Sequence, residues 1–167
     1  MLDRAAIAAR IPHAGRMCLL ERVLEWDASG IRCAAVSHLH ADNPLRSVSC
    51  LPVWAGIEYA AQAAAVHGAL AAGRSESRRG VLAALRGVKA TRARLDDLYG
   101  ELLIEATRLH DDAAGGIYRF SLSVRDSVKE AGVEQAAAEA AVIGTVVSGP
   151  LLSGRFTLMF AAQDRAS

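Results

Sequence analysis

Residues 52–73 read PVWAGIEYAAQAAAVHGALAAG and form the one strongly helical pattern in the chain. Pro52 suits the first turn of a helix, where the N–H that it lacks would have no intrahelical partner, and Gly73 is a typical helix stop. Alanine makes up about half of residues 55–72, so another backbone can approach this helix closely on several sides. We therefore predict a helix roughly 30 Å long, with a sheet wrapped around it.

Strand patterns lie on both sides of this helix. Before it, residues 19–26 and 31–38 are expected to be strands, and Asp3 is expected to cap a short helix over residues 3–10. The later strand patterns cover residues 80–95, 101–109, 118–125, 136–147 and 155–160, the last as a short edge strand. This order predicts an α+β protein with a hotdog fold, an antiparallel β-sheet wrapped around one long central α-helix, in a single domain over residues 1–167. An exposed sheet edge predicts pairing into a homodimer.

The composition excludes several classes of protein. The 167 residues, 52% hydrophobic and 22% charged, suffice for one globular domain with a substantial core. A formal net charge of +1 gives no whole-chain support for a nucleic-acid surface. The three cysteines are widely spaced and form no CxxC pair, which predicts neither a disulfide framework nor a zinc site. We therefore expect no metal.

The chain carries no pattern that predicts export or membrane insertion. Its first residues lack a basic segment followed by an apolar run, as a secretory signal would require. The most apolar long stretch is interrupted by Glu58, Gln62 and His67, each costly in lipid. We therefore expect a soluble cytoplasmic protein.

Two motifs resemble a known enzyme family. The letters IPH at residues 11–13, with CLLERV at residues 18–23, are similar to the leading segment of 3-hydroxyacyl-acyl-carrier-protein dehydratases of the FabA/FabZ type. Pro52, followed six residues later by Glu58 and then by Gln62, resembles the start of their central helix. The letters HADNP at residues 40–44, with GIEY at residues 56–59, resemble the ApeP-like dehydratases of aryl-polyene clusters more closely. The resemblance covers most of the chain in element order.

The resemblance implies an activity. It is the dehydration of a 3-hydroxyacyl thioester, carried on the phosphopantetheine of acyl carrier protein, to the trans-2-enoyl thioester without a cofactor. Such a reaction needs a base for the α-proton, an acid for the departing hydroxyl and donors for the thioester oxygen. In the family, a histidine before the central helix is the base and a carboxylate on that helix is the acid. The two come from different protomers of a dimer.

The catalytic residues are carried over by position. Glu58 matches the helix carboxylate. The family's Gly-His-Phe-Pro phrase is absent, and counting back from Pro52 places Pro44 where its histidine would lie. His40, just ahead of the Asp-Asn-Pro phrase, is therefore the expected base. His38 is the alternative, because a strand that continued to residue 40 would place both on one face.

The same resemblance suggests residues that contact substrate. They are Asn43, Pro52, Val53, Gly56 and Gln62. Backbone N–H groups at the helix start would polarise the thioester carbonyl, aided by the helix dipole, although Val53 replaces the family's glycine there. Gly56 would give a thin helix wall beside an acyl channel. Gln62, one turn after the catalytic carboxylate, would orient it.

Structural interpretations stand beside these functional ones. Glu58 could be a buried acid paired with Arg46, and His13 could cap a turn after Pro12. His67 is expected to be structural, because it faces away from Glu58 on the helix.

The sequence also leaves the partners and two rival functions open. An arginine patch is either a solvated face or a docking surface for acyl carrier protein; it comprises Arg74, Arg78, Arg79 and Arg86. One rival function is a catalytically silent hotdog subunit that binds acyl chains or completes a heterodimer with an active dehydratase. The other is an acyl thioesterase, in which a carboxylate on the same fold activates water.

Overall fold

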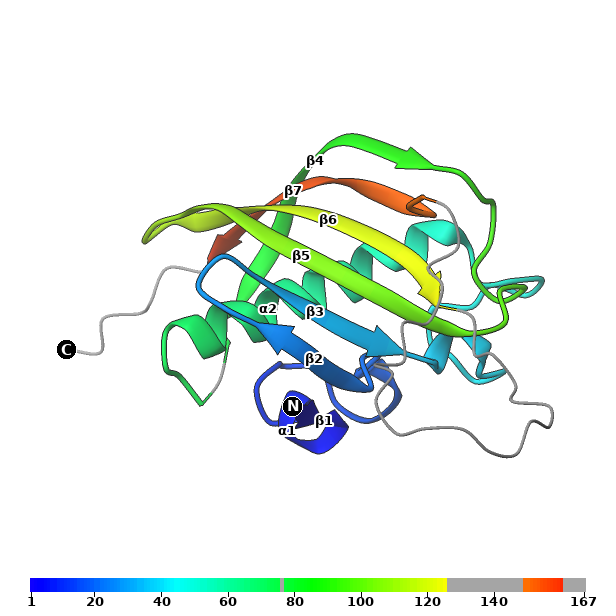
Figure 1. Ribbon diagram of the computed structural model, residues 1–167, viewed down its shortest axis with the longest axis horizontal. Coiled ribbons are helices and arrows are strands. Elements are labelled where there is room, and N and C mark those ends of the chain that lie inside the picture. Colours follow the sequence, from blue (N-terminus) through cyan, green and yellow to red (C-terminus); the bar gives the residue numbers. More distant parts are fainter. Residues whose placement is uncertain (76, 126–148, 161–167) are drawn as a thin grey trace, which may run out of the picture.

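The computed structural model describes residues 1–75, 77–125 and 149–160, and its main feature is one sheet curved around one long helix (Figure 1). The strands are β1 (Leu2–Asp3), β2 (Arg22–Trp26), β3 (Gly30–Ala35), β4 (Gly80–Ala90), β5 (Glu101–Asp111), β6 (Gly115–Arg125) and β7 (Leu152–Phe160). The helices are α1 (Arg4–Ala8) and α2 (Gly56–Ala71), with short 3₁₀ turns η1 (Gly15–Met17), η2 (Ser37–Leu39) and η3 (Val53–Ala55). The seven strands are ordered β1-β2-β3-β5-β6-β7-β4, and each pair of neighbours is antiparallel. This is the predicted α+β hotdog fold.

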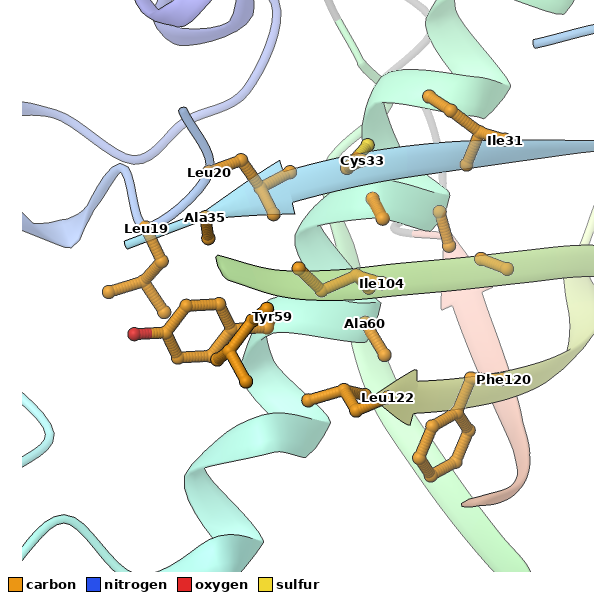
Figure 2. Close-up of a cluster of buried hydrophobic side chains, with 14 of the residues drawn as sticks. Leu19, Leu20, Ile31, Cys33, Ala35, Tyr59, Ala60, Ile104, Phe120 and Leu122 are labelled. Carbon is orange, nitrogen blue, oxygen red and sulfur yellow. The ribbon is translucent and has the colours of Figure 1, made fainter. Parts of the chain in front are cut away.

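Helix α2 is central because its alanine-rich surface packs on the concave side of the sheet, against β3, β5 and β6. Figure 2 shows Tyr59 and Ala60 of α2 in the buried cluster that also contains Ile104 of β5. A Cβ added at Gly56 would lie 2.7 Å from Leu122 Cδ2 and 2.8 Å from Leu152 Cδ2, so both leucine side chains would have to shift. Small residues therefore set how closely the helix approaches the sheet.

The structure confirms both predicted helices. Residues 55–72 were expected to be helical, and α2 covers Gly56–Ala71. The short N-terminal helix α1 is capped by Asp3, whose Oδ1 accepts a hydrogen bond of 2.9 Å from the backbone N–H of Ala6. Strands β5 and β6 also lie where strands were expected and extend beyond the predicted ranges.

The expected strand over residues 31–38 ends early, at Ala35. A 3₁₀ turn follows, closed by backbone hydrogen bonds from Leu39 N to Val36 O and from His40 N to Ser37 O. The inference that His38 and His40 share one strand face is therefore wrong, because local turn bonds replace the sheet ladder at this point.

The edge of the sheet also differs from the prediction. Residues 155–160 were expected to form an edge strand, but β7 lies between β6 and β4, and β4 is the edge (Figure 1). Strand β7 pairs on both sides, with Arg155 opposite Arg119 of β6 and Arg86 of β4. Spatial order depends on where the chain goes after α2, which strand periodicity does not encode. The strand expected over residues 136–147 lies outside the described residues.

Within the described residues, no helix combines the length and apolar character needed to span a membrane.

Candidate active site

An imidazole and a carboxylate meet at the first turn of α2. His13 Nε2 lies 3.1 Å from Glu58 Oε1, and the two side chains are 31% and 33% exposed. Glu58 extends from α2, whereas His13 follows Pro12 in the segment between α1 and η1. A single chain therefore supplies an acid–base pair that ligands can reach.

The alternative partner for this carboxylate, Arg46, is elsewhere. Arg46 Nη2 binds Asp96 Oδ2 at 2.6 Å, and Arg94 binds the same carboxylate. The predicted Glu58–Arg46 pair is therefore wrong. The hydrogen bonds from Arg94 are the main reason that the pKa of Asp96 is well below its usual value.

Gln62 joins the first turns of α2 to the segment that carries His13. Its Nε2 donates to Met17 O at 2.8 Å and to Glu58 Oε1 at 3.0 Å, while its Oε1 accepts from Leu19 N at 3.0 Å. The contact with Glu58 is the one that the predicted orienting role requires. Because Gln62 is 1% exposed, these bonds form in a dry environment where leaving them unmade would be costly.

The hydrogen bonds assign different tasks to the atoms of the pair. A carboxylate oxygen that carries no proton only accepts, so Glu58 Oε1 favours the imidazole tautomer with its proton on Nε2. The lone pair then lies on His13 Nδ1, which is buried and has no hydrogen-bond partner among the described residues. Within the described part of the chain, His38 Nδ1 is buried and unpaired in the same way, so this property alone does not distinguish a reactive nitrogen from a structural one.

The pair lies on the wall of a cavity of about 360 Å³. One wall is a single face of α2, because Glu58, Ala61, Ala65 and Gly68 recur at helical spacing. The facing walls carry apolar side chains from β4, β6 and β7, namely Leu82, Tyr118, Leu158 and Phe160. Arg74, Arg78, Asp111 and Asp112 also line this cavity, so apolar walls separate the pair from further charged groups. Such a groove suits a ligand with an apolar middle whose reacting atoms lie at the pair.

The two histidines expected to be catalytic lie elsewhere in the chain. His38 is fully buried, and its Nε2 lies 3.1 Å from Leu98 O. Burial lowers the pKa of His38, so this imidazole is neutral near pH 7. His40 is exposed at the end of η2 and is not among the residues that line the cavity with Glu58. Catalysis by His40 stays a prediction.

Asn43 has its polar groups engaged inside the protein. Its Nδ2 donates to Ser37 O at 2.9 Å and to the Tyr59 hydroxyl at 3.0 Å, and its Oδ1 accepts from Leu45 N at 2.9 Å. These bonds hold the loop before α2 against the core. Substrate binding by Asn43 stays a prediction.

Backbone contacts also fix the residues at the start of α2. The Val53 N–H donates to Ala93 O at 3.0 Å, so it is already used, and Pro52 forms an isolated bridge with Arg94. Gly56 packs on two leucines of the sheet rather than lining the cavity. Contact between substrate and these three residues stays a prediction.

His67 belongs to a buried polar chain behind the cavity wall. Its Nε2 lies 2.9 Å from Asp27 O, which can only accept, so its Nδ1 accepts from the Tyr118 hydroxyl at 2.9 Å. Burial lowers the pKa of His67 and raises the pKa of Tyr118 to about 12. This arrangement agrees with the structural role expected for His67.

We expect stability to fall on acidification. The folded-state pKa values of His38 and His67 lie below the ordinary value of 6.5 because both are buried. Below pH 6.5 the two histidines bind more protons in the unfolded chain than in the folded one, which favours unfolding. The stability that the neutral histidines allow is therefore complete above pH 6.5 and is lost as the pH falls toward their folded-state pKa values. Thermal melts from about pH 8 to about pH 5 should show a falling Tm, with a flatter profile for H38Q/H67Q. A Tm that stays level in the wild type would contradict this.

Among the described residues, no group of three or more His, Cys, Asp or Glu side chains is arranged to hold a metal ion. Cys18 and Cys33 are buried free thiols, and burial raises the pKa of both, to about 12 for Cys33. Neither thiol is suited to nucleophilic chemistry.

Comparisons with known proteins show the family and the fold of this chain. The family model described as "ApeP-like: ApeP dehydratase" matches residues 5–145. The ApeI:P dehydratase heterocomplex from Xenorhabdus doucetiae is similar over 98% of this chain and 93% of that chain, with a TM-score of 0.69 and 20% identity. Zebra fish thioesterase superfamily member 2 is similar over 95% and 93%, with a TM-score of 0.52 and 15% identity. At these identities the solved structures show a shared fold. No curated protein matches the sequence.

Proposed function

This chain belongs to the ApeP-like dehydratase family, and from that premise we propose that it dehydrates a 3-hydroxyacyl thioester to the trans-2-enoyl thioester. The observation that carries the proposal is the contact of 3.1 Å between His13 and Glu58 on the wall of a cavity that runs along α2. The acyl group would be carried by acyl carrier protein through its phosphopantetheine.

The geometry of the pair supports a simple division of labour. Substrate binding turns the buried Nδ1 of His13 toward the cavity. His13 Nδ1 then takes the α-proton, and the C–H electron pair forms the new double bond as the bond from the β-carbon to the hydroxyl breaks. Glu58, protonated on Oε2, gives its proton to the departing hydroxyl, which leaves as water. One proton has then moved from substrate carbon to substrate oxygen. Transfer from His13 to Glu58 along their hydrogen bond, with exchange through water, restores the starting state.

A second hotdog subunit would complete the cavity. Leu82 and Leu85 of β4 pair with Leu158 and Phe156, and Phe156 is buried on the helix side of the sheet. Directly opposed residues share a face, so both leucines point to that side, yet they are 41% and 42% exposed. We propose that a partner subunit pairs along the edge of β4 that no described strand occupies and covers them.

The partner is either a second copy of this chain or a related hotdog subunit. The solved ApeI:P assembly is described as a heterocomplex, which favours the related subunit here. A partner also keeps His40 as a rival base, because an exposed histidine on one subunit could reach Glu58 only across the interface.

The test is to incubate the purified chain with 3-hydroxyacyl-acyl carrier protein and follow the product by intact mass. Loss of one water supports the dehydratase. A free acyl carrier protein thiol would instead mean a thioesterase. No change, with activity appearing only when a second hotdog subunit is added, would contradict the stand-alone enzyme and support the partner-subunit role. Light scattering on the same samples reports the assembly.

A further inference from the structure

The cavity continues well beyond the catalytic pair. The face of α2 that begins at Glu58 includes Ala61, Ala65, Gly68 and Ala72 along the cavity wall. Ten residues separate Glu58 from Gly68, about 15 Å of helix. A substrate that reacts at Glu58 therefore has an apolar path along the helix axis.

Arg78 lines the same cavity and is held in place by two contacts. Its guanidinium carbon lies 4.0 Å from the ring centroid of Phe160, and its Nη2 donates to Ala113 O in the β5–β6 turn at 2.7 Å. The neighbouring Ser77 N–H donates to Arg10 O at 2.6 Å, in the segment that leads to His13. Arg78, Ser77 and Phe160 all line the cavity. The side chain of Arg78 is thus held between β7 and the β5–β6 turn.

Gly68 keeps the middle of the path open. A Cβ added there would meet nothing within 4 Å, whereas one at Gly56 on the same helix would collide with two leucines. Glycine inside a helix destabilises it relative to alanine or leucine. No close neighbour requires a glycine at position 68, so we attribute the glycine to the open groove beside it.

We propose that Gly68 and Arg78 set the length of the acyl chain that the site accepts. Gly68 lets the chain pass the middle of α2, and Arg78 stops it at the Phe160 end. This inference rests on the proposed function only in placing the thioester at His13 and Glu58. The cavity also carries four charged side chains, Arg74, Arg78, Asp111 and Asp112. The ligand is an unbranched acyl chain, because the helix face and the strands opposite it line the path along α2 with small and apolar side chains.

The test measures binding, so that it does not depend on catalysis. The full chain, in the assembly that it forms on purification, is titrated by calorimetry with saturated acyl-pantetheines of increasing length, which cannot be dehydrated. The affinity of the wild type should rise about fourfold for each methylene of the acyl chain that the cavity buries. This rise should stop at a limiting acyl-chain length.

The variants should move this limit in opposite directions. G68L should shift it to shorter chains, with at least a tenfold loss for the longest ligand, and should melt no lower than the wild type because leucine favours helix. R78A should extend the limit to longer chains. R79A is the matched control: Arg79 is exposed, adjacent in sequence and absent from the cavity wall, so its limit should stay that of the wild type.

Two results would overturn the proposal: a wild type that binds no acyl-pantetheine, or a limiting length that is the same in the wild type, G68L and R78A. A wild type with a clear limit, moved as expected by both variants but with no dehydratase activity, would support the chain-length sites while contradicting the proposed reaction.

Discussion

Replacing Glu58 with glutamine or His13 with alanine should each lower kcat/KM for dehydration by roughly 10²–10⁴-fold. E58Q keeps the volume of the side chain and an acceptor oxygen for His13, but it removes the acid that protonates the departing hydroxyl. H13A removes the base. Both side chains are about one-third exposed, so neither change leaves a large void in the core. Steady-state kinetics with 3-hydroxyacyl-acyl carrier protein measures the effect, and circular dichroism checks the fold.

H40A is the matched control for this prediction. His40 is an exposed histidine outside the cavity wall, so its removal should leave kcat/KM near the wild-type value. The opposite pattern, an inactive H40A beside an active H13A, would show that the base is His40 and that it comes from the partner subunit.

Replacing Phe120 with alanine should lower the free energy of unfolding by about 3–5 kcal/mol. Phe120 is 1% exposed, and its ring centroid lies 5.4 Å from that of Phe156. The surrounding strands are held by ladder hydrogen bonds on both sides of β6, so they cannot collapse to fill the space. Urea unfolding followed by circular dichroism measures the change.

Tyr99 offers a control of the same kind, because it is an aromatic residue with 84% exposure. Y99A should change stability by no more than about 0.5 kcal/mol. Equal losses from Y99A and F120A would mean that the β6–β7 region is not the rigid core described above.

Local patterns predicted the elements well where one physical cause dominates. The alanine-rich run with Pro52 and Gly73 at its ends predicts α2, because propensity and termination signals agree. Alternation over residues 118–125 predicts β6, because one face of this strand is buried and the other is not. Strand ends and strand order were predicted less well. Hydrogen bonds of the η2 turn ended β3 at Ala35, and the path after α2 put β4 rather than β7 at the edge.

The candidate site was predicted in part. Glu58 is near Gln62 because residues four apart on a helix are neighbours, which sequence spacing alone implies. His13 was assigned no catalytic role, although it lies in the leading motif that resembles the dehydratase family. The motif was the available signal, but nothing in the spacing says that a residue 45 positions before Glu58 reaches it.

The helix, the hotdog order of elements and the helix carboxylate therefore follow from the sequence, because each depends on residues within a few turns or strands of one another. The pairing of His13 with Glu58, the burial of His38 and the contact of Arg78 with Phe160 were decided only by tertiary structure. Each joins segments far apart in the chain, and each depends on contacts such as those of Gln62 with Met17 and Leu19 that exist only once the core has formed.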